Sequence, residues 1–249
     1  MLISVIMPVH NNLCFLKESI DSILNQTVKD FEIIIIDDAS TEPIWDTLDA
    51  YKRDKRFVFE KNERNIGSVR TLNRALDLAK GDIIARQDSD DISLPTRFEE
   101  ELKLLCGNVG IVSCYGRAID SNGKRVADSN IDKKIRMEAF EIHKQMLSRP
   151  CNYVLGPAAV FSRSVFDKIG YYDDTIGCGA EDTNYWYRAF QFFDFGVVTK
   201  ELFLYRINPK SMRKTQRDQF GSGTFGKVER RKWIFERSKT HTVISRHEV

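Results

Sequence analysis

Two acidic clusters follow apolar, strand-like segments of this sequence. Asp37-Asp38 comes directly after Phe31–Ile36, and the run Asp88-Ser89-Asp90-Asp91 follows Asp82–Arg86 after one residue. In an open parallel sheet, residues that follow the strands gather at the carboxyl edge, where ligands bind. Carboxylates gathered there repel one another, at about 4 kcal/mol for a pair roughly 4 Å apart at an effective dielectric near 20. A divalent cation with oxygen ligands removes this repulsion and neutralises a diphosphate, so the clusters predict a metal-assisted site.

Each cluster also has a plainer interpretation. Asp-rich loops often form turns or cap helices by accepting hydrogen bonds from backbone N–H groups. Either cluster alone fits that interpretation. Two such clusters at one edge of one sheet fit it much less well, and the metal site is therefore the leading hypothesis.

Alternating patterns in the first half of the chain supply the elements that position these clusters. Strands are predicted at Leu2–Met7, Phe31–Ile36, Phe57–Lys61 and Asp82–Arg86. Helices are predicted through Leu16–Leu24 and over Ile44–Tyr51 and Val69–Ala79, where apolar residues recur at three- and four-residue spacing. Strand and helix alternate in the manner of a right-handed, Rossmann-like, doubly wound α/β fold with a mostly parallel sheet.

The second half of the chain is predicted to contain shorter elements. Strands are predicted at Val109–Tyr115, Val154–Phe161 and Val197–Tyr205, with a hairpin over Ile119–Arg125. Helices are predicted after Pro95, over Arg163–Ile169 and over Glu181–Phe193. The linker-like stretch Gly221–Gly226 precedes the most basic part of the chain.

The net charge of +2 conceals an uneven distribution. Residues 206–249 contain twelve Lys or Arg and four acids, so this segment carries about +8 and residues 1–205 carry about −6. A basic segment of this kind suits a membrane surface, an anionic substrate or a neighbouring subunit, although a solvated helix face explains it equally well. We expect no nucleic-acid partner.

The cysteines and apolar runs indicate a reducing compartment. The five cysteines are odd in number and lack a CxxC pair, which argues against a disulfide framework or a zinc site. The strand-like start at Leu2 lacks the basic leader of a signal peptide, and the longest aliphatic run, Ile33–Ile36, is far too short to span a bilayer. The expected location is cytoplasmic, with peripheral contact at the inner face of the membrane as the alternative.

The motifs together resemble the inverting glycosyltransferase family 2, whose members have a GT-A fold. The resemblance rests on Pro8-Val9-His10-Asn11, Asp37-Asp38-Ala39-Ser40, Asn65-Ile66-Gly67, the DxD-like Asp88–Asp91 run and Glu181-Asp182, in that order along the chain. It covers about residues 1–210. It implies a glycosyltransferase domain at 1–210, with nucleotide-sugar binding at 1–115, an acceptor-side subregion at 116–210 and a basic extension at 211–249.

The resemblance implies a role for each matching residue on the donor side. Pro8, His10 and Asn11 would line the nucleobase pocket, and Asp38 would accept from the ring N–H of a uracil-type base. The remaining expected nucleotide contacts are Arg64, Asn65, Arg70, Asp88 and Ser89. Asp90 would be the main ligand of Mn²⁺ or Mg²⁺, with Asp88 beside it. Surface charge and helix capping explain Arg64 and Arg70 equally well.

Asp182 is the predicted general base. Inversion at an anomeric carbon needs a carboxylate on the face opposite the leaving diphosphate, where it takes the proton of the attacking acceptor hydroxyl. Metal and backbone dipoles stabilise the departing diphosphate, so no separate protein acid is required. Glu181 is the alternative base, although the first acid of such a pair more often orients the substrate or caps the helix. Trp186 is the predicted acceptor contact among the nearby aromatic residues.

One departure from the family pattern affects the metal. The family's late Tyr-Arg-x-His-Pro-x-Ser element reads here as Tyr205–Ser211, with Asn208 in place of the histidine. An amide oxygen can ligate Mg²⁺ or Mn²⁺, but it is neutral and binds Mn²⁺ less strongly than an imidazole does. This departure favours diphosphate contacts from Arg206, Lys210 or Arg213.

Two other functions remain open at this stage. A sugar nucleotidyltransferase shares the sheet topology, but it usually has a Gly-rich, basic loop after the first strand, and Pro8–Asn12 offers none. A non-catalytic sugar-nucleotide sensor or assembly subunit would retain the fold. The intact Asp88, Asp90 and Asp182 argue against it, although Asn208 leaves this function open. The leading expectation is transfer from a UDP-sugar to a glycan, a lipid-linked oligosaccharide or a glycoprotein in bacterial polysaccharide biosynthesis, with a homo-oligomer as an alternative use of the basic segment.

Overall fold

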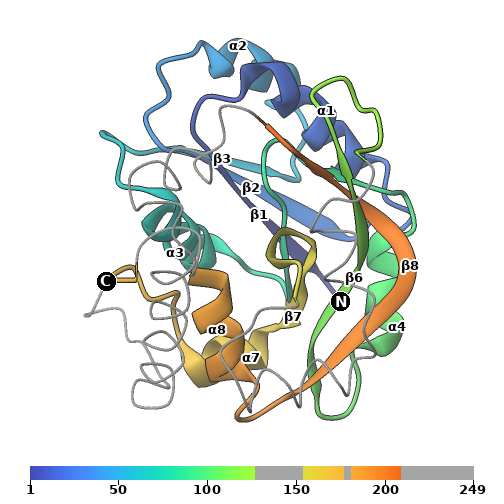
Figure 1. Cartoon of the computed structure of the whole chain (residues 1–249). Coiled ribbons are helices and arrows are strands. Elements are labelled where there is room, and N and C mark those ends of the chain that lie inside the picture. Colours follow the sequence, from blue (N-terminus) through green and yellow to red (C-terminus); the bar gives the residue numbers. More distant parts are fainter. Residues whose placement is uncertain (127–153, 177–180, 209–249) are drawn as a thin grey trace, which may run out of the picture.

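A single mixed sheet forms the centre of the molecule (Figure 1). The computed structural model describes residues 1–126, 154–176 and 181–208. In these ranges the strand order is β3-β2-β1-β4-β7-β6-β8-β5. The strands are β1 (Ile3–Val9), β2 (Phe31–Asp37), β3 (Phe57–Lys61), β4 (Ile83–Arg86), β5 (Ile92–Ser93), β6 (Val109–Ile119), β7 (Val160–Ser162) and β8 (Asp194–Arg206). Strands β1 to β4 are mutually parallel, as the sequence predicted, and β6 pairs parallel with β8.

Helices cover both faces of this sheet, which explains why its strands are apolar on both sides. In β2, Ile34 and Ile36 belong to the buried cluster that also contains residues of α3, α7 and α8, whereas Ile33 and Ile35 belong to the cluster that contains residues of α1, α2 and α4. The helices are α1 (Leu13–Leu24), α2 (Ile44–Leu48), α3 (Ser68–Leu78), α4 (Arg97–Leu104), α7 (Arg163–Ile169) and α8 (Glu181–Ala189), with the short 3₁₀ turns η1 (Asp49–Tyr51) and η2 (Gly156–Ala158). The predicted doubly wound α/β architecture is confirmed.

Three predicted elements differ from the structure. The strand predicted at Val154–Phe161 is replaced by η2 followed by the shorter β7, because Pro157 has no N–H to donate and its ring fixes a turn-like φ. The helix predicted over Ile44–Tyr51 ends at Leu48 and continues as η1. The helix predicted over Glu181–Phe193 ends at Ala189. In addition, β7 runs antiparallel to both β4 and β6, a reversal that the sequence pattern did not indicate.

The predicted subdivision at residue 115 falls within β6. The strands on both sides of this position belong to one sheet, so the two predicted subregions are parts of one folded unit, and their separate roles stay a prediction. The basic extension at 211–249, together with Lys210 and Arg213, lies outside the described residues. Within the described ranges, no helix is long and apolar enough to cross a membrane.

Candidate functional site

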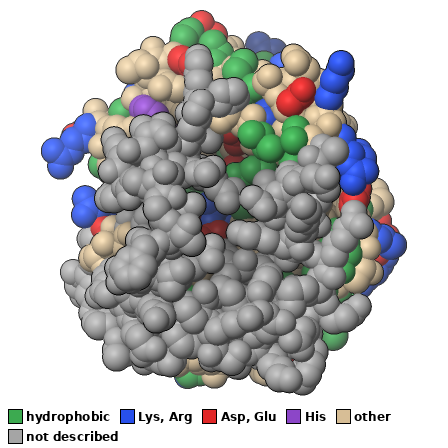
Figure 2. All heavy atoms as spheres, in the orientation of Figure 1, with side chains coloured by type: hydrophobic (Ala, Val, Ile, Leu, Met, Phe, Trp, Pro, Cys, Tyr) green, Lys and Arg blue, Asp and Glu red, His purple; other side chains and the backbone are tan. Residues whose placement is uncertain are grey.

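The carboxyl ends of β1, β2 and β4 bring the sequence-predicted loops together. Val9 pairs with Asp37 across β1 and β2, so the loops that begin at His10 and Asp38 leave the sheet side by side. The backbone N–H of Asp38 donates to the Val9 carbonyl at 2.7 Å and continues this pairing. On the face shown in Figure 2, acidic and basic side chains lie at the floor of a hollow.

Asp38 organises the loop that follows β3. Its carboxylate accepts hydrogen bonds from the Asn62 side chain at 2.8 Å and from the backbone N–H groups of Ile66 at 2.8 Å and Gly67 at 2.9 Å. Gly67 has a φ of 89°, which favours glycine and lets its N–H face the carboxylate. Asp38 is therefore buried and holds the segment that carries Asn65.

His10, Asp38 and Asn65, which the sequence analysis selected as nucleotide contacts, lie together at one corner of the site, although the Asp38 carboxylate is buried and turned to the protein's own donors. The His10 ring nitrogen Nδ1 lies 2.9 Å from the Asp38 carbonyl oxygen and 3.2 Å from the Asn65 side-chain nitrogen. Pro8 precedes this corner in β1 and is half-buried. Asn11 instead joins two loops, because its side-chain oxygen accepts from the backbone N–H of Glu42 at 3.1 Å.

The two predicted arginine contacts have different surroundings. Arg64 is exposed on the loop after β3. Arg70 projects from α3, and its Nε lies 2.5 Å from a carboxylate oxygen of Asp174. Because the Arg70 side chain remains 56% exposed, this pair lies at the rim of the site and is screened by water.

The backbone of the Asp88–Asp91 loop is held by Gln87, a residue that the sequence analysis missed. The buried amide nitrogen of Gln87 donates to the carbonyls of Asp88 at 3.2 Å and Asp91 at 2.9 Å. Its oxygen accepts from Ser93 and Arg97. The only sequence signal was a polar residue between an apolar strand and an acidic run, which does not reveal a clamp.

Two carboxylates of this loop, Asp90 and Asp91, have raised pKa values. Burial, followed by the charge of Asp88, raises the pKa of Asp90 to about 6. Burial and the charges of Asp90 and Asp88 raise the pKa of Asp91 well above its usual value, even though the Arg206 N–H donates to its Oδ1 at 2.7 Å. Its other oxygen is buried and, within the described residues, has no hydrogen-bond partner. Within the described residues, the negative charge of this loop is therefore not fully compensated.

These residues fit a divalent cation that is shared with a phosphate ligand. No group of three or more His, Cys, Asp or Glu side chains in the described ranges forms a metal cage by itself. Mg²⁺ is usually held by one or two carboxylates, with substrate phosphates and water completing its shell. Asp88 and Asp90 supply two carboxylates, and the raised pKa of Asp90 records the repulsion that a cation would relieve.

Asn208 faces this loop from the end of β8. Its side-chain nitrogen donates to Asp90 Oδ2 at 3.2 Å and to the Asn12 side-chain oxygen at 2.8 Å. Asn12 in turn donates to the Ser89 hydroxyl at 3.1 Å. The amide nitrogen of Asn208 thus faces Asp90, and ligation of a metal through its oxygen requires the amide to turn over. Asn12, with a φ of 64°, is a further site residue that the sequence analysis did not select.

Arg206 connects the Asp88–Asp91 loop to neighbouring segments. Its Nε donates to the Asp90 carbonyl at 2.9 Å, Nη1 donates to the Asp120 carbonyl at 3.1 Å, and Nη2 contacts the Glu18 carboxylate at 2.5 Å. The guanidinium also lies over the Phe15 ring. This arrangement directs the donors of Arg206 at the protein, so it corrects the predicted diphosphate contact to a role in holding the loop.

The Glu181-Asp182 pair begins α8 on the other side of the Asp88–Asp91 loop. Asp182 is half-buried, and its Oδ1 accepts from the backbone N–H of Thr183 at 2.6 Å. Its Oδ2 lies against Gly156, where an added Cβ would come within 2.6 Å. Glu181 is buried and lies 3.4 Å from Nη2 of Arg86.

Arg86 also approaches the Asp88–Asp91 loop, and the sequence analysis did not select this residue. The same Nη2 atom lies 3.6 Å from Asp88 Oδ1. A charged residue at the end of an otherwise apolar strand was the available signal. Asp88 of the acidic run and Glu181 of the Glu181-Asp182 pair, which were selected separately from the sequence, therefore both lie beside the Arg86 guanidinium.

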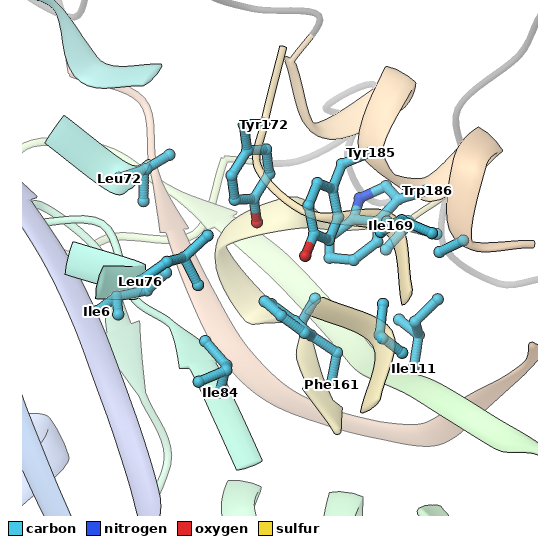
Figure 3. Close-up of a cluster of buried hydrophobic side chains, with 14 of the residues drawn as sticks. Ile6, Leu72, Leu76, Ile84, Ile111, Phe161, Ile169, Tyr172, Tyr185 and Trp186 are labelled. Carbon is cyan, nitrogen blue, oxygen red and sulfur yellow. The ribbon is translucent and has the colours of Figure 1, made fainter. Parts of the chain in front are cut away.

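The predicted acceptor contact from Trp186 is wrong. Its side chain has no exposed surface and packs among the rings of Phe161 and Tyr185 (Figure 3). Tyr172 stacks on Tyr185 in the same cluster, with ring centroids 4.1 Å apart. These aromatic residues fix α8 against the sheet and do not line the site.

Comparison with known families gives a match over most of the chain. The sequence model of Glycosyl transferase family 2 matches residues 4–170. An uncharacterized glycosyltransferase of Methanocaldococcus jannaschii is 33% identical over 215 residues, which are 83% of this chain and 71% of that protein. The O-antigen biosynthesis glycosyltransferase WbnJ of Escherichia coli is 30% identical over 224 residues, which are 86% of this chain and 83% of WbnJ.

Solved structures share the fold. S. aureus TarS 1-349 in complex with UDP-GlcNAc aligns with a TM-score of 0.69 at 21% identity, covering 85% of this chain and 60% of that chain. The mannosyltransferase PcManGT of Pyrobaculum calidifontis, in complex with GDP-Man and Mn²⁺, aligns with a TM-score of 0.67 at 16% identity, covering 96% of this chain and 73% of that chain. The predicted GT-A architecture is confirmed, and the chain spans less than two thirds of the TarS fragment that it matches.

Proposed function

Since the chain belongs to glycosyltransferase family 2, we propose that it transfers a sugar, with inversion, from a UDP-sugar to a hydroxyl group of a glycan, lipid-linked or glycoprotein acceptor. The observation that carries this proposal is the meeting of two acidic groups at Arg86. Asp88 opens the metal-binding loop and Glu181 opens the helix that carries Asp182, and both lie within 3.6 Å of the same nitrogen. This shared contact supports the proposal that the donor-holding loop and the start of the helix that carries the base border one site.

The donor half of the proposal uses the carboxyl ends of the parallel strands. His10 and Asn65 border the nucleobase, and Asp38 keeps their loops in place. Asp90 and Asp88 would hold Mn²⁺ or Mg²⁺. The bound cation would neutralise the diphosphate as it leaves, which is the chemistry that a protein acid would otherwise have to supply.

The acceptor half of the proposal assigns the proton to Asp182. The acceptor hydroxyl attacks the anomeric carbon from the face opposite the diphosphate, the bond to the diphosphate oxygen breaks, and the hydroxyl proton passes to Asp182. Asp182 is less enclosed than Glu181, which is 5% exposed and already faces Arg86. This difference supports Asp182 as base and Glu181 as an orienting group.

The names of similar proteins support the substrate classes. TarS was solved with UDP-GlcNAc and PcManGT with GDP-Man and Mn²⁺, so nucleotide-sugars occupy this fold. WbnJ is named for O-antigen biosynthesis, which supports a surface polysaccharide as the acceptor. We propose a UDP-sugar because of the resemblance at Asp38 and His10, and Mn²⁺ or Mg²⁺ because of the carboxylates at Asp88 and Asp90.

The decisive experiment compares Asp182→Asn with the wild type. A panel of UDP- and GDP-sugars is incubated with Mn²⁺ and glycan acceptors, and the anomeric configuration of the product is read by NMR. We expect an inverted product from the wild type. Asp182→Asn should lower kcat by about 10²- to 10⁴-fold, the usual contribution of general-base catalysis, while UDP binding in the presence of Mn²⁺ is unchanged by calorimetry.

The matched control is Glu181→Gln, which should lower kcat less than Asp182→Asn does. A larger loss in Glu181→Gln would assign the base to Glu181. A product that retains the donor's configuration, or wild-type kcat in Asp182→Asn, contradicts the proposed mechanism. Release of pyrophosphate from a nucleoside triphosphate and a sugar phosphate would identify a nucleotidyltransferase. Metal-dependent UDP binding without turnover of any donor would identify a sensor.

A further inference from the structure

Arg86 is a buried cation between two parts of the site that are distant in sequence. It is the last residue of β4 and only 6% exposed. Its Nη2 lies 3.4 Å from Glu181 Oε1 and 3.6 Å from Asp88 Oδ1. The Arg86 side chain thus lies beside both Asp88, the first residue of the Asp88–Asp91 loop, and Glu181, the first residue of α8.

The backbone of Arg86 is fixed from two sides. Its N–H donates to the Ala159 carbonyl at 3.0 Å, which joins β4 to the segment before β7. Its carbonyl accepts from Nη2 of Arg97 at 3.1 Å. The guanidinium lies 5.9 Å from the centroid of the Tyr172 ring, which belongs to the core beneath α8. Arg86 therefore presents its charge at a fixed point.

Comparison with Arg97 shows that Arg86 is not bonded like a purely structural arginine. Arg97 is equally buried, and each of its three nitrogens donates to a protein acceptor, among them Glu101, Ser93 and the Arg86 carbonyl. In Arg86, Nε and Nη1 are buried and have no hydrogen-bond partner within the described residues. Buried donors in a purely structural role are normally satisfied, and unsatisfied ones call for another explanation.

The charges around Arg86 explain why it is held there. Burial opposes the charge of the guanidinium, but the nearby acids, headed by Asp88, outweigh it and raise the pKa of Arg86 above its usual value. Glu181 and Asp182 belong to the same group of acids. A buried carboxylate such as Glu181 needs a cation beside it, and Arg86 is the guanidinium that contacts it.

We infer that Arg86 is a positioning residue for the transfer step: by holding Glu181, it orients the first turn of α8 so that Asp182 faces the donor. Arg86 touches neither reacting atom and acts through Glu181. The inference rests on the proposed function, because the role of Asp182 as base belongs to that proposal. It adds a specific dependence, in which the acceptor-side acids are aligned by a residue of the donor-side strand.

The test combines Arg86→Gln, Arg86→Lys, Glu181→Gln and the double variant Arg86→Gln/Glu181→Gln. With UDP-GlcNAc or GDP-mannose as donor, Arg86→Gln should lower kcat about 10- to 100-fold, as misplacement of a catalytic group by about 1 Å does. The affinity for UDP with Mn²⁺ should not weaken, because the change removes a positive charge near Asp88. Arg86→Lys should restore most of kcat. The double variant should be no slower than the slower single variant, since both changes remove the same contact.

Hydrogen exchange supplies a readout that needs no turnover. In Arg86→Gln, the amides of residues 181–185 should exchange faster than in the wild type, while those of α1 should not change. Arg163→Gln is the matched control. Its guanidinium bonds to the backbone carbonyls of Gly81 and Ala79 at the opposite end of β4, so this change should lower Tm without lowering kcat.

Two results would overturn the inference: wild-type kcat in Arg86→Gln, or multiplicative losses from Arg86→Gln and Glu181→Gln in the double variant. Unchanged exchange at residues 181–185 would overturn it as well. Failure of the proposed function looks different, because the wild type itself would then transfer no sugar from any donor. The exchange experiment would still decide whether Arg86 orders α8.

Discussion

The carboxylate of Asp182, the proposed base, has room beside the backbone because residue 156 is glycine. A Cβ at Gly156 would come within 2.6 Å of Asp182 Oδ2 and 3.1 Å of its Cβ. The nearest atom belongs to the end of a side chain, which can rotate away. The backbone therefore tolerates a methyl group at this position, while the carboxylate does not keep its place.

We predict that Gly156→Ala lowers kcat about 10- to 100-fold and leaves the fold intact, because it displaces the base by a fraction of its own size. Donor KM and the Kd of UDP with Mn²⁺ should remain within about twofold of the wild type, since the change is remote from His10 and Asp90. Steady-state kinetics and calorimetry measure these quantities. Gly123→Ala, in the turn after β6, is the control and should not affect kcat. Unchanged kcat in Gly156→Ala would mean that Asp182 is not placed by this contact.

Individual site residues were predictable where the backbone itself places them. His10, Asp38 and Asp88 follow directly after strands, so the sheet edge brings them together whatever their side chains do. Arg206 and Trp186 were placed incorrectly, because their roles depend on which tertiary neighbours surround them. Arg206 finds Glu18 and carbonyl oxygens. Trp186 belongs to α8, in which every residue except Asp182 is buried, including polar Asn184 and Arg188.

At the scale of elements, α4 anchors the Asp88–Asp91 loop through residues of a buried ion pair. Arg97 and Glu101 lie one helical turn apart, and Arg97 Nε is 3.1 Å from Glu101 Oε2. Both side chains are fully buried. Arg97 also bonds to Gln87 and to the Arg86 carbonyl, so α4 supports both the clamp and the strand end. Burial raises the pKa of Glu101 to about 7, although the charge of Arg97 opposes this rise.

This raised pKa predicts a pH-dependent stability. The folded state holds the Glu101 proton up to about pH 7, whereas the unfolded state loses it near the ordinary value of 4.5. The folded state therefore binds more protons between these values, and the free energy of unfolding falls as pH rises through this window. The full effect is at most about 3–4 kcal/mol, because each pKa unit corresponds to about 1.4 kcal/mol.

Glu101→Gln should remove this slope. Denaturant unfolding of the metal-free protein at several pH values between 5 and 7 measures it as the difference from the wild type. Glu99→Gln is the control, since Glu99 lies on the same helix and hydrogen bonds from Thr27 and Lys103 lower its pKa. It should leave the slope unchanged. Parallel wild-type and Glu101→Gln profiles would show that Glu101 is already ionised throughout this window.

The elements themselves were predicted best where both the period and the length were strong. The four parallel strands and α1 and α3 have apolar repeats that only one arrangement buries. The short β5 and the reversed β7 could not be predicted, because two or three residues carry no period and the direction of β7 is set by its neighbours β4 and β6. The missed reversal matters, since η2 before β7 brings Gly156 to Asp182.

At the scale of the whole molecule, the sheet gathers acids at one edge, and the cations among residues 1–126, 154–176 and 181–208 do not fully offset them. Asp90 has a pKa of about 6 in the folded protein and an ordinary value of 3.8, chiefly because of burial and then the charge of Asp88. At neutral pH its ionised form therefore weakens the metal-free fold, by up to about 3 kcal/mol at about 1.4 kcal/mol per pKa unit. A cation bound beside Asp90, as proposed, would recover this free energy and would couple metal binding to folding.

We predict that Asp90→Asn raises the Tm of the metal-free protein at pH 7.5, or leaves it equal, and abolishes stabilisation by ligand. In the wild type, UDP with Mn²⁺ at about 100 times Kd should stabilise the fold by about 2.7 kcal/mol, because only the folded state binds them. Thermal unfolding with and without UDP and Mn²⁺ measures both effects. Asp82→Asn, at the amino end of β4 where the carboxylate accepts from the Leu2 N–H, is the control and should keep the full ligand-dependent shift. If Asp90→Asn responds to UDP and Mn²⁺ as the wild type does, the cation is held elsewhere, and the excess negative charge at this edge has another purpose.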